Sequence, residues 1–211
     1  MRAARKNIVG VLLTWLLFAG VLLTANCGAT RPIKYYTLNS APAPSIAVKN
    51  NAPLPVTILV GRIAASPLYI EHPIVYTAGG VELGTYEYHR WAEIPTEMLE
   101  NMLTQTLRSK GKFRSVGRLG SGARGDYILR GHLYSLEEVD SPSLAARFSI
   151  ELELFQPKTG TIAWSQSYSH DEPVSQKTVV AVVEALRQNV LTGLDQLSAS
   201  LASYLSSVSS H

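Results

Sequence analysis

The sequence has a single cysteine, Cys27, among its 211 residues. One cysteine cannot form a disulfide within the chain, so a small fold held together by disulfides is excluded. An apolar core must stabilise the protein instead. The material for a core is present, because 46% of the residues are hydrophobic, and the length suits one globular domain of ordinary size.

Charge is also scarce, since only 17% of the residues are Asp, Glu, Lys or Arg. The net charge of +3 comes from the first 26 residues, which hold three of the 19 basic residues and none of the 16 acidic ones. The remaining 185 residues (211 − 26) are therefore neutral, with 16 − 16 = 0. A neutral domain lacks the basic surface that nucleic acid binding requires, so we expect no nucleic acid partner.

Catalytic and metal-binding patterns are missing as well. None of the five histidines stands at i, i+4 or in another metal-ligand spacing. Glu151 and Glu153 alternate with apolar residues, which places them on the solvated face of a strand. The glycines of residues 120–125 match a dinucleotide-binding pattern, but the residues that follow predict a strand where such a site needs a helix. We expect no catalytic residue, no metal site and no cofactor.

The N-terminus has the features of a targeting segment. A basic start is followed by an uncharged apolar run from Ile8 to Ala25, and Cys27 comes directly after it. This order predicts a lipoprotein signal peptide over residues 1–26 and an acylated Cys27. Asn26 stands where lipoprotein sites prefer a small residue, so two alternatives stay open. The run of 18 residues can just span a bilayer as an uncleaved anchor, or the chain is exported in soluble form.

The rest of the chain divides by composition. Residues 27–55 are rich in proline and small residues, which predicts a tether containing a short strand at residues 33–38. Residues 56–205 are expected to form a single α+β domain, and residues 206–211 a frayed, disordered tail.

The stretch from Val81 to Leu107 organises this domain. Its first half is rich in aromatic and β-branched residues, as in a strand, and Pro95 suits the first turn of a helix. After Pro95, methionines and leucines recur at helical spacing and form one apolar stripe. Gly111 is placed to end this helix.

The other elements follow from periodicity. Apolar residues on both faces predict a central strand at 56–63, and alternation predicts a three-stranded meander over residues 127–169. An apolar stripe predicts a helix over residues 176–205, with Ser175 as its N-cap. The expected fold class is α+β, with a mixed, largely antiparallel sheet and two helices packed on one face.

The segment Tyr86-Glu-Tyr-His-Arg-Trp-Ala-Glu-Ile-Pro95 resembles the tyrosine-rich strand and following corner of the ABC-type transport auxiliary lipoproteins, the paraquat-inducible protein C-like family. Residues 60–76 are similar to that family's first core strand and the loop after it, and residues 35–38 resemble its N-terminal strand. In the right order, these segments cover most of residues 27–172.

The resemblance implies an envelope lipoprotein of an ABC-type transport system for lipids or hydrophobic solutes. The implied partners are an MCE-domain protein and the ABC permease and ATPase, and the implied assembly is a homo-oligomer. The domain would lie in the periplasm on a lipid anchor, and the outer membrane is favoured over the inner one. The family has no catalytic motif. An alternative is a lipoprotein that regulates or scaffolds another envelope machine, for cell-wall synthesis or lipopolysaccharide assembly.

Four residues of the corner are candidates for partner binding: Tyr86, Tyr88, Arg90 and Trp91. Aromatic residues beside arginine are common anchors of protein interfaces. The alternative for Tyr88 and Trp91 is packing within the core.

Overall fold

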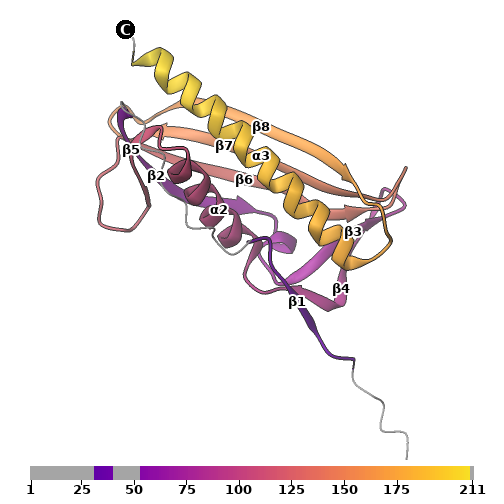
Figure 1. The fold of residues 1–211 in the computed structure, drawn as a ribbon. Helices are drawn as coiled ribbons and strands as arrows, with labels where there is room; N and C mark the ends of the chain where they lie inside the picture. The colour runs from indigo at the N-terminus through magenta and orange to yellow at the C-terminus, as the bar shows by residue number, and fades with distance from the viewer. Residues whose placement is uncertain (1–30, 40–52, 210–211) are drawn as a thin grey trace, which may run out of the picture. The chain divides into compact units, whose positions relative to one another are not determined.

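The computed structural model describes residues 31–39 and 53–209. The predicted signal peptide, Cys27 and most of the predicted tether therefore lie outside the described residues. The elements, shown in Figure 1, are β1 (Lys34–Tyr36), β2 (Leu54–Ala65), the 3-10 turn η1 (Pro67–Tyr69), β3 (Pro73–Ala78), β4 (Glu82–Trp91), α2 (Pro95–Ser109), β5 (Phe113–Arg118), β6 (Tyr127–Val139), β7 (Ala145–Gln156), β8 (Thr161–Pro173) and α3 (Val179–Val208).

Strand β6 is the centre of the sheet. One of its edges pairs with β7 along nearly its whole length, in antiparallel fashion. The other edge is shared: residues 127–133 pair in parallel with β2, and residues 137–139 pair in parallel with β3. The sheet therefore forks at β6, with β2 and β5 on one branch and β3, β4 and β1 on the other.

The sheet is mixed, as predicted. The antiparallel ladders β6–β7 and β7–β8 are the longest, and β3–β4 is a third. The parallel ladders are shorter, and they join β2 to β5 and β6, β3 to β6, and β1 to β4. Alternation along β7 buries Phe148, Ile150, Leu152 and Leu154, while Glu151 and Glu153 lie on the opposite face.

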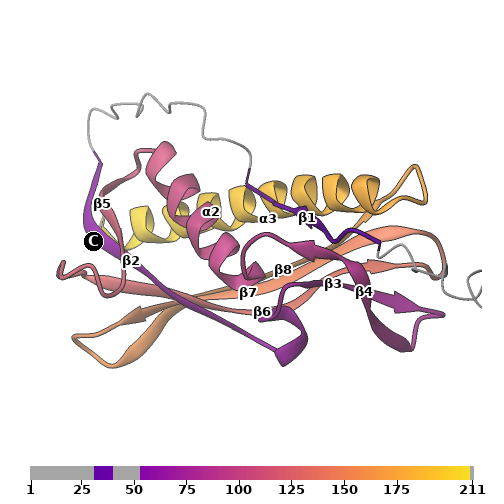
Figure 2. The same ribbon diagram turned by 90° about the horizontal axis from the view of Figure 1, so that it is seen from below.

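Both helices cover the same face of this sheet, as Figure 2 shows. Helix α2 packs on β2 and β5, and α3 packs on β7 and β8. The apolar stripe of α2 is buried as predicted, with Leu99, Leu103 and Leu107 each at 0% exposure. The predicted fold class, α+β with two helices on one face of a largely antiparallel sheet, is confirmed.

Several boundaries differ from the prediction. Strand β5 was not predicted, because its sequence Phe-Arg-Ser-Val-Gly-Arg is short and interrupted by charge and glycine. The N-cap of α3 is Thr178 rather than Ser175, since the Thr178 hydroxyl accepts a hydrogen bond from the Ala181 amide. Helix α3 continues to Val208 into the predicted tail. Strand β1 pairs with β4, so the compact unit begins at Ile33 and not at residue 56.

Helix α3 lies very close to the sheet at Gly193. A Cβ atom there would lie 2.6 Å from Cδ1 of Tyr168 and 3.1 Å from Cε1 of Phe148. The Tyr168 ring has little freedom to move away, because its hydroxyl donates a 2.8 Å hydrogen bond to Oδ1 of the buried Asn189. The same Asn189 amide donates to the carbonyls of Ala146 and His170, which ties α3 to two strands.

We predict that Gly193→Ala destabilises the domain, although alanine favours a helix by ~1 kcal/mol over glycine. Overpacking a fixed core site costs ~1–3 kcal/mol, so the net loss should reach up to about 2 kcal/mol. Urea unfolding of the domain measures it. The neighbouring Thr192 is exposed on the same helix and provides the control, because Thr192→Ala should be neutral or slightly stabilising. Equal gains in stability from both substitutions would contradict the close packing at residue 193.

Candidate functional site

The corner between β4 and α2 is fixed by backbone hydrogen bonds from both sides. The Trp91 amide donates to the carbonyl of His72 at 2.6 Å, and the Ala92 amide donates to the carbonyl of Tyr36 at 2.7 Å. Pro95 then begins α2, where its missing N–H costs nothing. The corner is therefore a rigid junction of β1, the loop before β3, β4 and α2.

The four predicted partner-binding residues occupy different environments. Trp91 is 1% exposed and lies in the core, so it supports the corner from within and offers no contact surface. Tyr86, Tyr88 and Arg90 are partly exposed. Nε of Arg90 is buried and has no hydrogen-bond partner among the described residues. The structure thus leaves Arg90 and the two tyrosines as the accessible members of the set.

An aromatic cluster surrounds Tyr86. Its ring meets Tyr76 and His89 edge-on, with ring centroids 5.2 and 5.5 Å apart, and Nδ1 of His89 is 2.8 Å from the hydroxyl of Tyr36. The Tyr86 hydroxyl donates a 2.7 Å hydrogen bond to Glu138, which is only 7% exposed. Burial, followed by this bond to a carboxylate, raises the pKa of Tyr86. The phenol therefore stays protonated and acts as a donor that holds β4 against β6.

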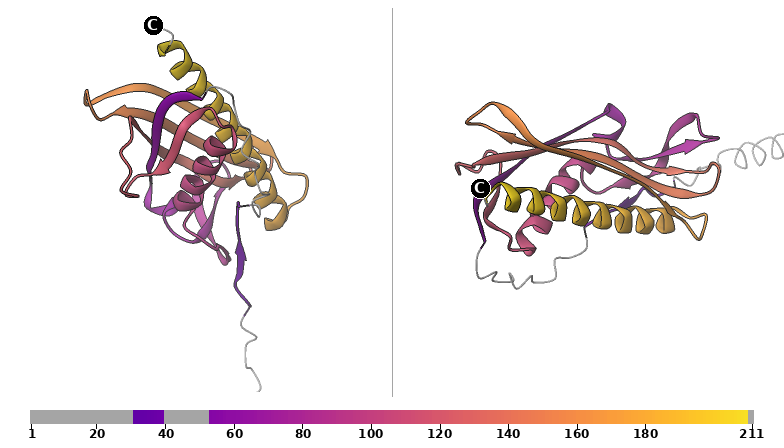
Figure 3. Two further views of the ribbon diagram at one scale, coloured as in Figure 1. Left: turned by 60° about the vertical axis from the view of Figure 1, so that its left-hand side comes forward. Right: turned by 90° about the horizontal axis from the view of Figure 1, so that it is seen from above.

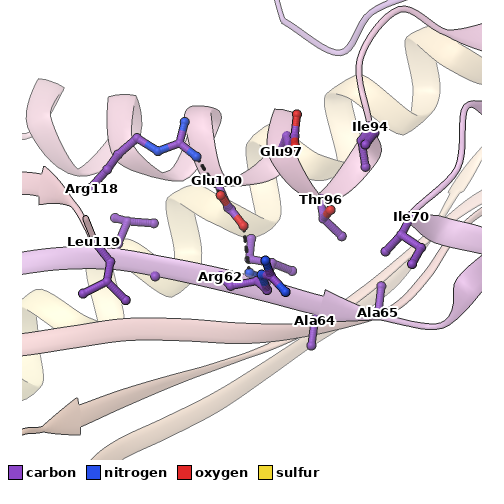
Figure 4. Close-up of a pocket in the computed structure, with 13 residues that line it drawn as sticks. Arg62, Ala64, Ala65, Ile70, Ile94, Thr96, Glu97, Glu100, Arg118 and Leu119 are labelled. Atoms are coloured by element: carbon purple, nitrogen blue, oxygen red, sulfur yellow. Dashed lines mark hydrogen bonds and ion pairs between the residues drawn. The ribbon is translucent and has the colours of Figure 1, made fainter. Parts of the chain in front are cut away.

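A groove of about 710 Å³ adjoins the corner. Its floor is residues 60–65 of β2, its wall is the first turns of α2, and the corner residue Ile94 lines it. Figure 4 shows Ile70 and Leu119 at opposite ends of the groove. Both are apolar and about half exposed, at 47% and 52%.

The groove exists because β5 ends early. The last pair between β2 and β5 joins Val60 to Arg118, while β2 continues to Ala65. In the described part of the chain, residues 61–65 have a strand partner only on the β6 side. The other edge of these residues, ~16 Å long at 3.3 Å per residue, faces the groove.

Glu100 of α2 takes the place of the missing strand at one point of this edge. The Ile63 amide donates a 3.0 Å hydrogen bond to Oε1 of Glu100. Nη2 of Arg118 donates to Oε2 of the same carboxylate at 2.8 Å, and Nη1 of Arg118 donates to Asn101. One carboxylate thus satisfies a strand amide and fixes the end of β5, as the dashed lines in Figure 4 show.

This arrangement is suited to binding an extended polypeptide. An open strand edge offers backbone donors and acceptors, and apolar side chains at the two ends can fix the register of a bound segment. The described residues contain no group of three or more His, Cys, Asp or Glu side chains placed to hold a metal ion. None of the helices in the described part combines the length and hydrophobicity that crossing a membrane requires.

The remaining candidates from the sequence lie elsewhere. Cys27 is outside the described residues. Glu151 accepts hydrogen bonds from Tyr134 and Ser165 on the solvated face, and the Tyr134 bond is the main reason its pKa is lowered. The glycines at 120–125 form a loop that leads into β6, so no helix follows them.

Comparison with known proteins assigns the chain to a family. The family model described as "ABC-type transport auxiliary lipoprotein component" matches residues 36–202. The chain belongs to this family. The match spans the strand–helix corner and the groove, and it ends within the last helix. No curated protein matches the chain.

Solved structures share the fold at low sequence identity. A protein from Xanthomonas campestris is 21% identical, with a TM-score of 0.72 over 86% of this chain and 100% of its own. An uncharacterised protein is 17% identical, with a TM-score of 0.61 over 82% of this chain and 97% of its own. A PelC dodecamer from Paraburkholderia phytofirmans is 15% identical, with a TM-score of 0.46 over 72% of this chain and 89% of its own.

Sequence reasoning located the corner but missed the groove. The corner could be found because a strand pattern ends there at a proline. The groove depends on where β5 stops relative to β2, and β5 was not predicted. The pair Ile63 and Glu100 carries no sequence signal, since the two residues are 37 positions apart and one of them contributes only its backbone amide.

We predict that the two roles of Glu100 separate on substitution. Glu100→Ala leaves the Ile63 amide without its partner and should cost ~1–3 kcal/mol. Glu100→Gln keeps an acceptor oxygen and loses only the ion pair with a largely exposed arginine, which should cost less than ~1 kcal/mol. Urea unfolding of both variants compares them. Equal losses would show that the carboxylate does not replace a strand at this edge.

Proposed function

We propose that the protein is a lipid-anchored auxiliary component of an ABC-type system that transports lipids or other hydrophobic solutes across the envelope. Membership of the auxiliary lipoprotein family carries this proposal. The partners would be an MCE-domain protein and the ABC permease and ATPase complex. Its role would be docking rather than catalysis, and it would act as a homo-oligomer.

The corner and the adjoining groove are the proposed docking site. Arg90 supplies a guanidinium whose Nε lacks a partner among the described residues, and a carboxylate of the transport partner would pair with it. The groove would accept an extended segment of the same partner along the open edge of β2. Both features lie next to α2, so one partner chain can use both.

Anchoring would place this site near a membrane. The proposed acyl chains on Cys27 would hold the domain at the periplasmic face of the envelope, preferably at the outer membrane. Because β1 is already part of the sheet, only residues 28–33 separate the proposed anchor from the folded unit. Six residues span at most ~22 Å, so the partner must be reached close to the membrane surface.

We predict that Cys27→Ser abolishes lipid attachment. Cells fed labelled palmitate should incorporate the label into the wild-type protein and not into the variant. The variant should also leave the membrane fraction, because no other anchor is expected. Equal label in the two proteins would contradict acylation at Cys27.

We predict that Arg90→Glu weakens binding of the MCE component by at least ~2 kcal/mol, because reversal places an unpaired or like charge in the contact. Binding of the purified component to wild-type and variant domains measures it, with circular dichroism confirming the fold of each.

Two control variants separate charge from packing. Arg90→Met keeps the aliphatic stem, so it should preserve the fold and lose the ionic contact. Lys158→Glu reverses an exposed charge in the β7–β8 turn, away from the corner, and should leave affinity unchanged. Unchanged affinity for a folded Arg90→Glu protein would remove the corner from the interface.

A further inference from the structure

The hairpin between β3 and β4 ends in an apolar tip. Its turn has positive φ at both Gly79 and Gly80, at 58° and 77°, which suits a tight two-residue hairpin turn. The next residue, Val81, is 91% exposed, and Leu83 is 48% exposed. Residues 81 and 83 are two positions apart, so their side chains share a side of the strand.

The tip is held firmly. The Gly79 amide donates a 2.8 Å hydrogen bond to Oδ1 of Asp140, and the Asp140 amide donates to the carbonyl of Thr77. On the strand behind the tip, the Tyr76 ring lies against Gly84, where a Cβ atom would come within 2.5 Å of it. A fixed turn therefore presents two aliphatic side chains to the surroundings.

The direction of β1 relates this tip to the proposed anchor. Strand β1 is parallel to β4, with Lys34 opposite His89. The chain therefore enters β1 from the end of the sheet where the β3–β4 tip lies. This hairpin extends past the end of β6, as Figure 2 and the right-hand view of Figure 3 show.

Two lengths can now be compared. Along β4, the tip lies eight residues before His89, which is ~26 Å at 3.3 Å per residue. Cys27 precedes Lys34 by seven residues, which span at most ~25 Å when fully extended. A tether of this length, directed along β1, cannot hold a membrane surface clear of the tip.

We propose that Val81 and Leu83 contact the lipid surface to which Cys27 is anchored, and that this contact sets the orientation of the domain. The inference rests on the proposed acylation of Cys27. Acyl chains alone attach the domain without orienting it, whereas a second apolar contact some distance from the first restricts its tilt. The occupant is a lipid surface rather than a protein, because the length of the tether brings that surface to the tip.

The opposite end of the sheet provides a matched control. Ile162, near the start of β8, is 49% exposed, close to the value for Leu83. It lies beside Phe155, which pairs with the first residues of β6, whereas the tip lies beyond the last residues of β6. The 13 residues of β6 separate the two ends by ~43 Å.

The test uses the full chain, lipidated in cells, with Val81→Cys, Leu83→Cys or Ile162→Cys as the site of a thiol-reactive fluorophore. An acylated Cys27 leaves no competing thiol. The labelled proteins are reconstituted into phosphatidylethanolamine and phosphatidylglycerol vesicles with nitroxide-bearing lipids. Quenching at residues 81 and 83 should be at least about twice that at residue 162, because a tip ~5–10 Å within the headgroup boundary contacts the nitroxide.

The outcomes are distinct. Proteins that float with the vesicles but show equal quenching at both ends would overturn the tip contact while leaving the anchor intact. Proteins that neither float nor carry lipid would overturn the anchor, and the tip contact with it. A fluorophore at residue 81 that is shielded equally without vesicles, in the Cys27→Ser background, would show that a protein or a second copy covers the tip, which also overturns the proposal.

Discussion

Strand β6 offers one edge to two parallel strands, β2 along its first half and β3 along its last residues. Because β2 and β3 cannot both occupy that edge at the same level, the chain must cross between them after Ala65. The crossing is secured on β6 by Glu137, which is 4% exposed and accepts hydrogen bonds from the hydroxyls of Tyr69 and Thr77. Two branches of sheet result, and α2 runs from the end of one branch to the face of the other.

This fork generates both parts of the candidate site. The β3–β4–β1 branch ends at the corner that turns into α2, so the tyrosine-rich strand and the helix are joined through a few rigid residues. The β2–β5 branch leaves the last residues of β2 without a second strand, because β5 ends at Arg118. Helix α2 lies above that edge and closes the groove with Glu100. The corner and the groove are therefore two consequences of one division of β6.

Much of this could be predicted from the sequence where the signal is local. Alternation identified β7 and β8, and the proline at residue 95 marked the start of α2 correctly. The misses have physical reasons. Strand β5 is held by its parallel neighbour rather than by its own composition, and Thr178 rather than Ser175 caps α3 because the chain between them is still leaving β8. The groove depends on the relative lengths of two strands, and no residue pattern encodes it.

Burial also changed the meaning of the predicted site. Trp91 carries much of the family resemblance, yet it lies in the core, while Arg90 beside it keeps a donor without a partner in the described structure. The central claim is that the corner and groove form the docking surface of a transport auxiliary protein. Photo-crosslinking in intact cells tests it most directly, with a photoreactive residue at Ile70 in the groove and at Tyr134 on the opposite face of the sheet. The account predicts crosslinks to an MCE-domain or ABC component from position 70 and none from position 134, and crosslinks to that component from position 134 alone would contradict it.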